Sequence, residues 1–224
     1  MTSNLTIRSN TVTRLTADQL DFILFDGSSS MYSKWWPMLE ATDAYIAGLK
    51  AQNIKTHIVL DVFDSHDLKL RGRDTHIDQW KTFGEDPLGS HFGSTPLYDA
   101  IVVMGHTIRE LNPQKCAVTI VTDGDEVGST FADIHQARAV LDWLRAQGFP
   151  VTFIGCDFDN DRQARALGAN ASNSIGVRKE LLTDATKRYA EKRARNVRSG
   201  DDISFTADEK QKFGGYLGHQ GGGA

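Results

Sequence analysis

The chain has 224 residues, enough for one α/β domain with a substantial core, and 40% of them are hydrophobic and 24% charged, as in ordinary globular proteins. The formal net charge of −4 gives no support to nucleic-acid binding. No stretch approaches the ~20 apolar residues of a membrane span, and no apolar signal-peptide region is visible, so we expect a cytoplasmic protein without a membrane partner. Cys116 and Cys156 lie in apolar runs, which favours reduced core thiols over a disulfide.

The first half of the chain alternates between apolar runs and a helical pattern. Residues 22–25 form the first run, a stripe at helical spacing through residues 39–49 follows, and residues 57–63 form the second run. Both runs are nearly continuous in apolar residues, which is typical of strands buried on both faces of a parallel sheet. Further on, Leu68 and Leu70 alternate with polar neighbours, which predicts an antiparallel edge strand.

The second half continues this alternation. In chain order it has a helical stripe at 97–111, a strand at 117–122, a helical stripe at 134–144, a strand at 151–156 and a weaker strand at 174–177. Strands that alternate with helices predict a Rossmann-like, doubly wound α/β fold. We therefore expect a mostly parallel sheet with one antiparallel edge strand and with helices on both faces.

The last part of the chain changes in composition. Residues 178–198 contain eight Lys or Arg and three Asp or Glu, and the stripe of Leu181, Ala185 and Tyr189 predicts a last helix docked on the sheet. A solvated helix face is the favoured interpretation of this charge, with contact to an acidic partner or to nucleic acid as the alternative. We predict a single domain over residues 1–198, followed by a flexible, glycine-rich tail at 199–224.

Oxygen-bearing side chains follow two of the expected strands and precede one helix. Asp26, Ser28 and Ser30 leave the first strand in the stretch DGSSSM. Asp123 leaves a later strand, and Thr95 comes just before a strongly periodic helix. Because ligands of open parallel sheets bind outside the carboxyl ends of the strands, we expect the five side chains to meet there. Hydroxyl and carboxylate oxygens suit Mg²⁺ or Mn²⁺, and no His or Cys joins the set to favour zinc.

The segments DGSSS, GSTPLYDA and TDGDE resemble the metal-ion-dependent adhesion site (MIDAS) of von Willebrand factor type A (vWA) domains. The family's D-x-S-x-S motif maps onto Asp26, Ser28 and Ser30, its threonine onto Thr95 and its later aspartate onto Asp123. The similarity covers roughly residues 20–195, and the chain also resembles compact intracellular members from bacteria and phages. It implies the vWA fold and a metal ion whose coordination is completed by an Asp or Glu carboxylate of a partner protein.

The resemblance also implies a binding module and not an enzyme. Intracellular members often act beside AAA-type ATPases or in stress-response complexes. Because the chain has no G-x-x-x-x-G-K-[ST] motif, such an ATPase would be a separate protein. Candidates for the surface that meets a partner are Trp35, His91, Phe92, Asp125 and Glu126. Adjacent tryptophans at positions 35 and 36 cannot both point inward from a helix, so we expect one of them to be exposed.

Two other functions stay open. An oxygen-ligated Mg²⁺ can activate water in a hydrolase or hold phosphate in a phosphoryl-transfer enzyme, with Asp125 or Glu126 as the base, although no G-x-S-x-G motif is present. In a structural or assembly role, self-association would bring a carboxylate such as Asp208 or Glu209 from a neighbouring copy to the metal. The D-x-D-x-D array of residues 157–161 fits a helix start better than a second metal site.

Overall fold

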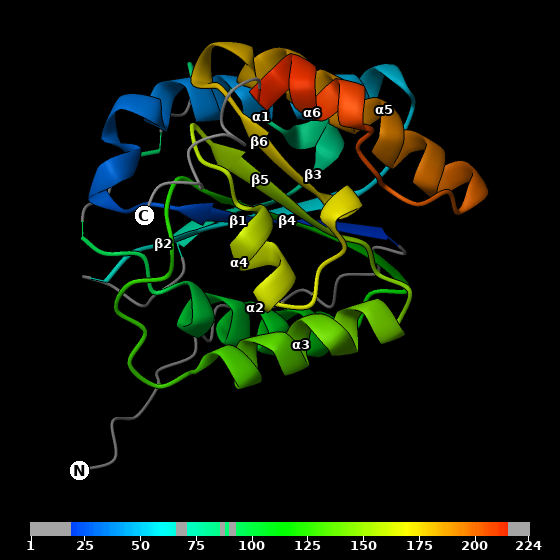
Figure 1. The fold of residues 1–224 in the computed structure, drawn as a ribbon. Helices are drawn as coiled ribbons and strands as arrows, with labels where there is room; N and C mark the ends of the chain where they lie inside the picture. Colours follow the sequence, from blue (N-terminus) through cyan, green and yellow to red (C-terminus); the bar gives the residue numbers. More distant parts are fainter. Residues whose placement is uncertain (1–18, 66–70, 86–87, 90–92, 215–224) are drawn as a thin grey trace.

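A computed structural model of the chain describes residues 19–65, 71–85, 88–89 and 93–214. A central sheet of six strands lies between two layers of helices (Figure 1). The strand order is β3-β2-β1-β4-β5-β6, and every neighbouring pair is parallel except β2 and β3, which are antiparallel. The strands are β1 (Gln19–Asp26), β2 (His57–Phe63), β3 (Arg71–His76), β4 (Lys115–Thr122), β5 (Val151–Cys156) and β6 (Ser174–Val177).

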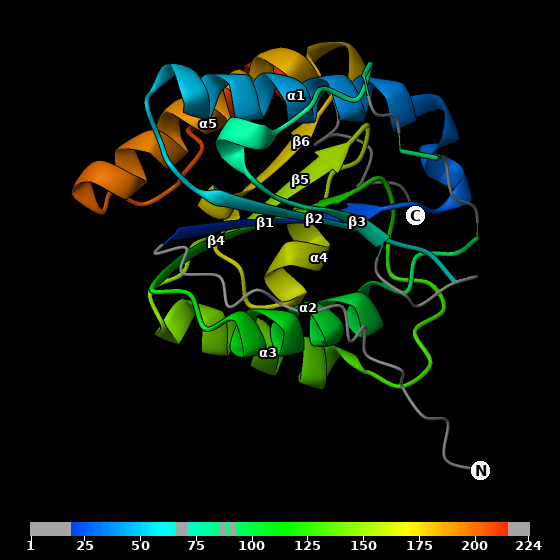
Figure 2. The same cartoon turned by 180° about the vertical axis from the view of Figure 1, so that it is seen from behind.

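The helices cover both faces of this sheet, as the two opposite views show (Figure 1, Figure 2). One face carries α1 (Trp35–Ala51), α5 (Leu182–Ser199) and α6 (Ala207–Gly214). The other face carries α2 (Leu97–Leu111), α3 (Ile134–Ala146) and α4 (Asp161–Ala166). Short 3-10 helices are η1 (Ser29–Lys34), η2 (Ile77–Gln79), η3 (Ala171–Asn173) and η4 (Lys179–Leu181). Within the described residues, no helix combines the length and the apolar character needed to cross a bilayer.

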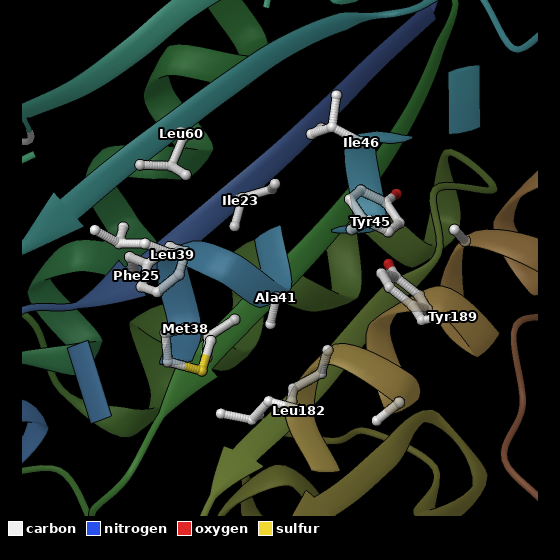
Figure 3. Close-up of a cluster of buried hydrophobic side chains, with 14 of the residues drawn as sticks. Ile23, Phe25, Met38, Leu39, Ala41, Tyr45, Ile46, Leu60, Leu182 and Tyr189 are labelled. Carbon is white, nitrogen blue, oxygen red and sulfur yellow. The ribbon is translucent and has the colours of Figure 1, made fainter. Parts of the chain in front are cut away.

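The central strand β1 divides the core into two layers. All eight of its residues are buried, and successive side chains point to opposite faces. Ile23 and Phe25 pack against α1 and α5, where the rings of Tyr45 and Tyr189 stack with centroids 5.0 Å apart (Figure 3). Phe22 and Leu24 pack against α2 and α3. Burial on both sides explains why the run is continuously apolar.

The fold class predicted from the sequence is confirmed. The expected parallel strands are present, and the antiparallel edge strand exists as β3. Leu68 and Leu70, on which the edge strand was placed, lie outside the described residues. Both cysteines are buried free thiols, as expected, and burial raises the pKa of each thiol.

The predicted domain boundary at residue 198 is wrong. Ile203, Phe205 and Phe213 are 1%, 5% and 3% exposed and belong to the core on the α1 and α5 face. The backbone N–H of Phe205 donates to Ser172 O at 2.7 Å, and Glu209 pairs with Lys192 at 2.9 Å. Residues 200–214 are therefore part of the domain, and the glycine-rich stretch 215–224 lies outside the described residues.

A buried ion pair joins β1 to α5. Arg193 Nε lies 2.8 Å from Asp21 Oδ1, and both side chains are at most 3% exposed. Tyr45 donates to the same carboxylate at 2.9 Å and Thr56 at 2.6 Å. The carboxylate is thus fully satisfied, and removing one partner leaves an uncompensated charge in the core.

We predict that Arg193→Met lowers the free energy of unfolding by about 3–5 kcal/mol, because Asp21 then keeps a buried charge without a cation. Urea unfolding followed by circular dichroism measures the change. The matched control Arg195→Met, at an exposed position of the same helix, changes it by less than about 0.5 kcal/mol. Equal losses for the two variants would contradict the structural role of the pair.

Phe213→Ala tests the corrected boundary. We expect it to lower the free energy of unfolding by about 3 kcal/mol, because it removes a buried ring from the core. Gln211→Ala, two residues earlier and exposed, is the control and leaves stability nearly unchanged. If Phe213→Ala were as stable as the control, residues 200–214 would not contribute to the core, and the boundary at residue 198 would stand.

Candidate metal centre

The strand order reverses between β1 and β4, so the loops that leave these neighbours go to opposite faces of the sheet. The chain after β1 enters α1 on one face, and the chain after β4 enters α3 on the other (Figure 1). Such a switch point leaves a crevice outside the carboxyl ends of the strands, where α/β proteins bind ligands. Asp26 ends β1, and Asp123 directly follows β4.

Asp26 is fully buried and is held by neutral donors. Its Oδ1 accepts the backbone N–H of Ser28 at 2.8 Å, and its Oδ2 accepts the hydroxyl of Thr122 at 2.6 Å. Among the described residues, no cationic side chain forms an ion pair with it. Burial raises the pKa of Asp26 to about 6, although the hydrogen bonds from Thr122 and Ser28 oppose the shift. A buried carboxylate with no cation beside it is a favourable ligand for a metal ion.

The two serines of the motif bring hydroxyls next to the second aspartate. Ser28 and Ser30 lie with their hydroxyl oxygens 3.0 Å apart, because the chain turns into η1 directly after Ser28. The hydroxyl of Ser30 donates to Asp123 Oδ1 at 2.6 Å. Side chains from two loops that are 93 residues apart in the sequence therefore form one continuous polar cluster.

The loop that carries Thr95 is linked by backbone hydrogen bonds to the segments that carry the cluster. The carbonyl of Thr95 accepts the N–H of Val127 at 2.9 Å, which links its loop to the segment after β4. Two residues earlier, the carbonyl of Gly93 accepts the N–H of Ser29 at 3.0 Å, which links the same loop to η1. Thr95 itself is 5% exposed. Backbone hydrogen bonds thus link the three motif segments, and among the described hydrogen bonds none joins the Thr95 hydroxyl to the cluster.

Lys34 is a residue of the site that sequence reasoning missed. Its ammonium nitrogen lies 2.5 Å from Asp123 Oδ2 and 3.5 Å from the carbonyl of Ser30. The Asp123 side chain is 0% exposed and the Lys34 side chain 16%. Lys34 lies at the end of the 3-10 helix η1, four residues after Ser30, and no motif or periodic pattern in the sequence marked it.

The expected role of Trp35 at a partner surface is wrong. Trp35 is 4% exposed, its ring packs edge-on against Phe25 with centroids 6.1 Å apart, and its Nε1 donates to Leu88 O at 3.3 Å. Trp36 is the exposed member of the pair, at 56%. His91 and Phe92 lie outside the described residues.

Asp125 and Glu126 have partners of their own. Asp125 is exposed and pairs with Arg162 at 3.1 Å. Glu126 accepts the backbone N–H groups of Tyr98 at 2.9 Å and Ser129 at 2.8 Å, so it fastens the start of α2 to the loop after β4. Neither carboxylate contacts the five-residue cluster through a described hydrogen bond.

The acidic array at 157–161 serves local structure. Asp157 accepts the N–H of Lys179 at 2.9 Å, Asp159 accepts the N–H of Asp161 at 3.1 Å, and Asp161 pairs with Lys210 at 3.1 Å. These contacts agree with a helix start. Within the described residues, no group of three or more His, Cys, Asp and Glu side chains lies close enough to hold a metal ion.

The donor set around Asp26 fits a hard divalent cation. It consists of two aspartates and the hydroxyls of Ser28 and Ser30, all oxygen donors of the kind that Mg²⁺ and Mn²⁺ prefer. The buried charge of Asp26, which lacks a cation, is the observation that favours a metal there. Lys34 is the feature that opposes one, because its ammonium already neutralises Asp123.

Comparison with known proteins places the fold. Neither a protein-family model nor a curated protein sequence matches the chain. Solved structures do. A von Willebrand factor type A protein from Catenulispora acidiphila is 15% identical with a TM-score of 0.57 over 79% of this chain and 42% of that one. The vWF domain of the type V pili tip protein Mfa5 from Porphyromonas gingivalis is 8% identical with a TM-score of 0.61 over 87% and 99%.

The pilus adhesin SpaC from Lactobacillus rhamnosus GG, in an open conformation, is 12% identical with a TM-score of 0.60 over 80% of this chain and 30% of that one. The chain thus spans less than half of the Catenulispora and SpaC chains and nearly all of the Mfa5 domain. At these identities the likeness is one of fold. The chain has the α/β fold of von Willebrand factor type A domains.

Proposed function

We propose that this domain is a protein-interaction module that binds Mg²⁺ or Mn²⁺ and, through the ion, a carboxylate of a partner protein. The observation that carries the proposal is the convergence of Asp26, Ser28, Ser30 and Asp123 at the switch point of the sheet. The vWA fold supports it, because solved relatives with this fold include pilus adhesins.

The residues of the cluster would contribute charged and neutral oxygens to the metal. Asp26 and Asp123 supply the negative charge, and Ser28, Ser30 and Thr95 supply neutral oxygens. Neutral ligands leave most of the charge on the ion, so a bound Mg²⁺ or Mn²⁺ supplies a Lewis acid with affinity for an anionic oxygen. Thr122 holds the Asp26 carboxylate in place with a 2.6 Å hydrogen bond and is a positioning residue.

Exposed apolar side chains in and after the segments that carry the cluster favour a protein partner. Among the described residues, the large hydrophobic side chains that are exposed are Tyr32, Trp36, Val127 and Phe131, at 70%, 56%, 59% and 41%. The first two follow the DGSSS segment, and the other two follow Asp123. Apolar and aromatic side chains gathered near a polar centre are typical of protein interfaces. A separate AAA-type ATPase, or a stress-response complex that contains one, is the partner class that the sequence resemblance suggests.

The alternatives have less support. Hydrolysis needs a free base near the metal, and both candidates, Asp125 and Glu126, have other partners. Self-association through the tail loses one of its two candidate carboxylates, because Glu209 pairs with Arg188 at 2.7 Å and Lys192 at 2.9 Å within the same chain. Asp208, the other candidate, is exposed. We therefore propose a binding role without catalysis.

Metal binding by purified protein is the first test. Isothermal titration calorimetry with Mg²⁺ and Mn²⁺ should show one ion per chain, and Asp26→Ala should weaken binding at least tenfold because a charged ligand is lost. Ser30→Ala, at an exposed position, should weaken it without loss of folding. Asp125→Ala is the acidic control outside the cluster and should bind like wild type. No detectable binding of either ion to the wild type would overturn the proposal.

Partner binding is the second test. A partner captured by the wild-type domain in Mg²⁺ should be released by EDTA and should not be captured by the Asp26→Ala variant. Once that partner is identified, Trp36→Ala should weaken the domain's affinity for the partner about tenfold and leave its affinity for Mg²⁺ unchanged. The reason is that an exposed tryptophan contributes to the interface and not to metal binding. Trp143→Ala, a half-buried tryptophan of α3, is the control. Capture that survives both EDTA and Asp26→Ala would argue against metal-bridged binding.

A further inference from the structure

Asp123 has both of its oxygens engaged within the chain. Oδ1 accepts the hydroxyl of Ser30 at 2.6 Å, and Oδ2 accepts the ammonium of Lys34 at 2.5 Å. Because the Asp123 side chain is 0% exposed, water cannot compensate its charge, and Lys34 provides the compensation. The charge of Asp123 is therefore balanced by Lys34 within the chain.

Lys34 is placed so that it competes with a divalent ion. A cation bound by Ser28, Ser30 and Asp123 would stand beside an ammonium group that shares the Asp123 carboxylate, and like charges at such short range repel strongly in a partly buried site. The ammonium is a compact charge on a flexible stem, and the Lys34 side chain is 16% exposed. It therefore has a path to solvent once the carboxylate has another cation.

We propose that Lys34 is an internal counter-cation of this site, which a divalent metal must displace from Asp123. The inference rests on the proposed metal binding and adds a residue that sets the affinity. Lys34 stabilises Asp123 when no divalent ion is bound and lowers the affinity for the metal, so the chain binds the ion weakly by itself.

The experiment compares Lys34→Met, Lys34→Arg and wild type by calorimetric titration with Mn²⁺ and Mg²⁺, after folding is verified by circular dichroism. We expect Lys34→Met to bind at least tenfold tighter than wild type, and Lys34→Arg, which keeps the charge, to remain near wild type. Lys50→Met removes an exposed lysine at the other end of α1 and should leave the affinity unchanged. In EDTA, the unfolding temperature of Lys34→Met should be lower than that of wild type, and added metal should raise it again.

A second measurement uses the wild type alone and so does not depend on the folding of a variant. Acetylation of Lys34 by a water-soluble reagent, followed by mass spectrometry, should become several-fold faster when Mn²⁺ is added, because the ammonium leaves Asp123. Lys55, which pairs with the exposed Asp78 at 2.8 Å, is the internal reference.

The outcomes separate the two proposals. If wild type and Lys34→Met bind metal equally well, or if Lys34→Met binds more weakly, the counter-cation role is overturned while metal binding stands. Slower or unchanged acetylation in Mn²⁺ also overturns it. If neither protein binds either ion, both proposals fail together.

Discussion

The site depends on the parallel pairing of β1 with β4. In this register Phe25 lies opposite Val121, so the residues that end the two strands, Asp26 and Thr122, become neighbours across the ladder. Their 2.6 Å hydrogen bond fixes the buried carboxylate, and the next residue of β4's chain is Asp123. The chain leaves the two strands toward opposite faces, to α1 and to α3, which is the arrangement that forms a crevice at the carboxyl ends of the strands.

Strand β1 carries two buried carboxylates, and within the described residues only one of them is paired with a cationic side chain. Asp21 near its amino end receives Arg193 together with two hydroxyl donors, so its charge is compensated inside the core. Asp26 at the carboxyl end receives only neutral donors, and burial raises its pKa to about 6. The first arrangement holds α1, α5 and β1 together, whereas the second leaves a charge that an external cation can satisfy. This contrast separates a structural carboxylate from one available for function.

Sequence patterns predicted the sheet and the placement of Asp26 and Asp123 at one edge of it, because both rest on local signals. Asp26 and Asp123 each end a continuous apolar run, and that is enough to place them at one edge of a parallel sheet. The burial of Trp35 was not predictable. The 3-10 helix before α1 sets the rotation of α1 about its axis, and this rotation decides which of the two adjacent tryptophan rings faces the core. The packing of Phe205 and Phe213 was also hidden, since single aromatic residues in a polar stretch form no periodic stripe.

The Lys34–Asp123 ion pair joins residues 89 positions apart, and its proposed role would link the affinity for a metal to the affinity for a partner. Under the proposed counter-cation role, a metal beside the displaced ammonium would gain stability from every negative charge brought to it, and a partner's carboxylate would bring one. The affinities for the metal and for the partner would then be coupled, and the coupling would be reciprocal, each raising the other by the same factor. Under the same proposal, Lys34 would make metal retention depend on the acidic partner, whereas the same cluster without the lysine would hold the ion in the partner's absence.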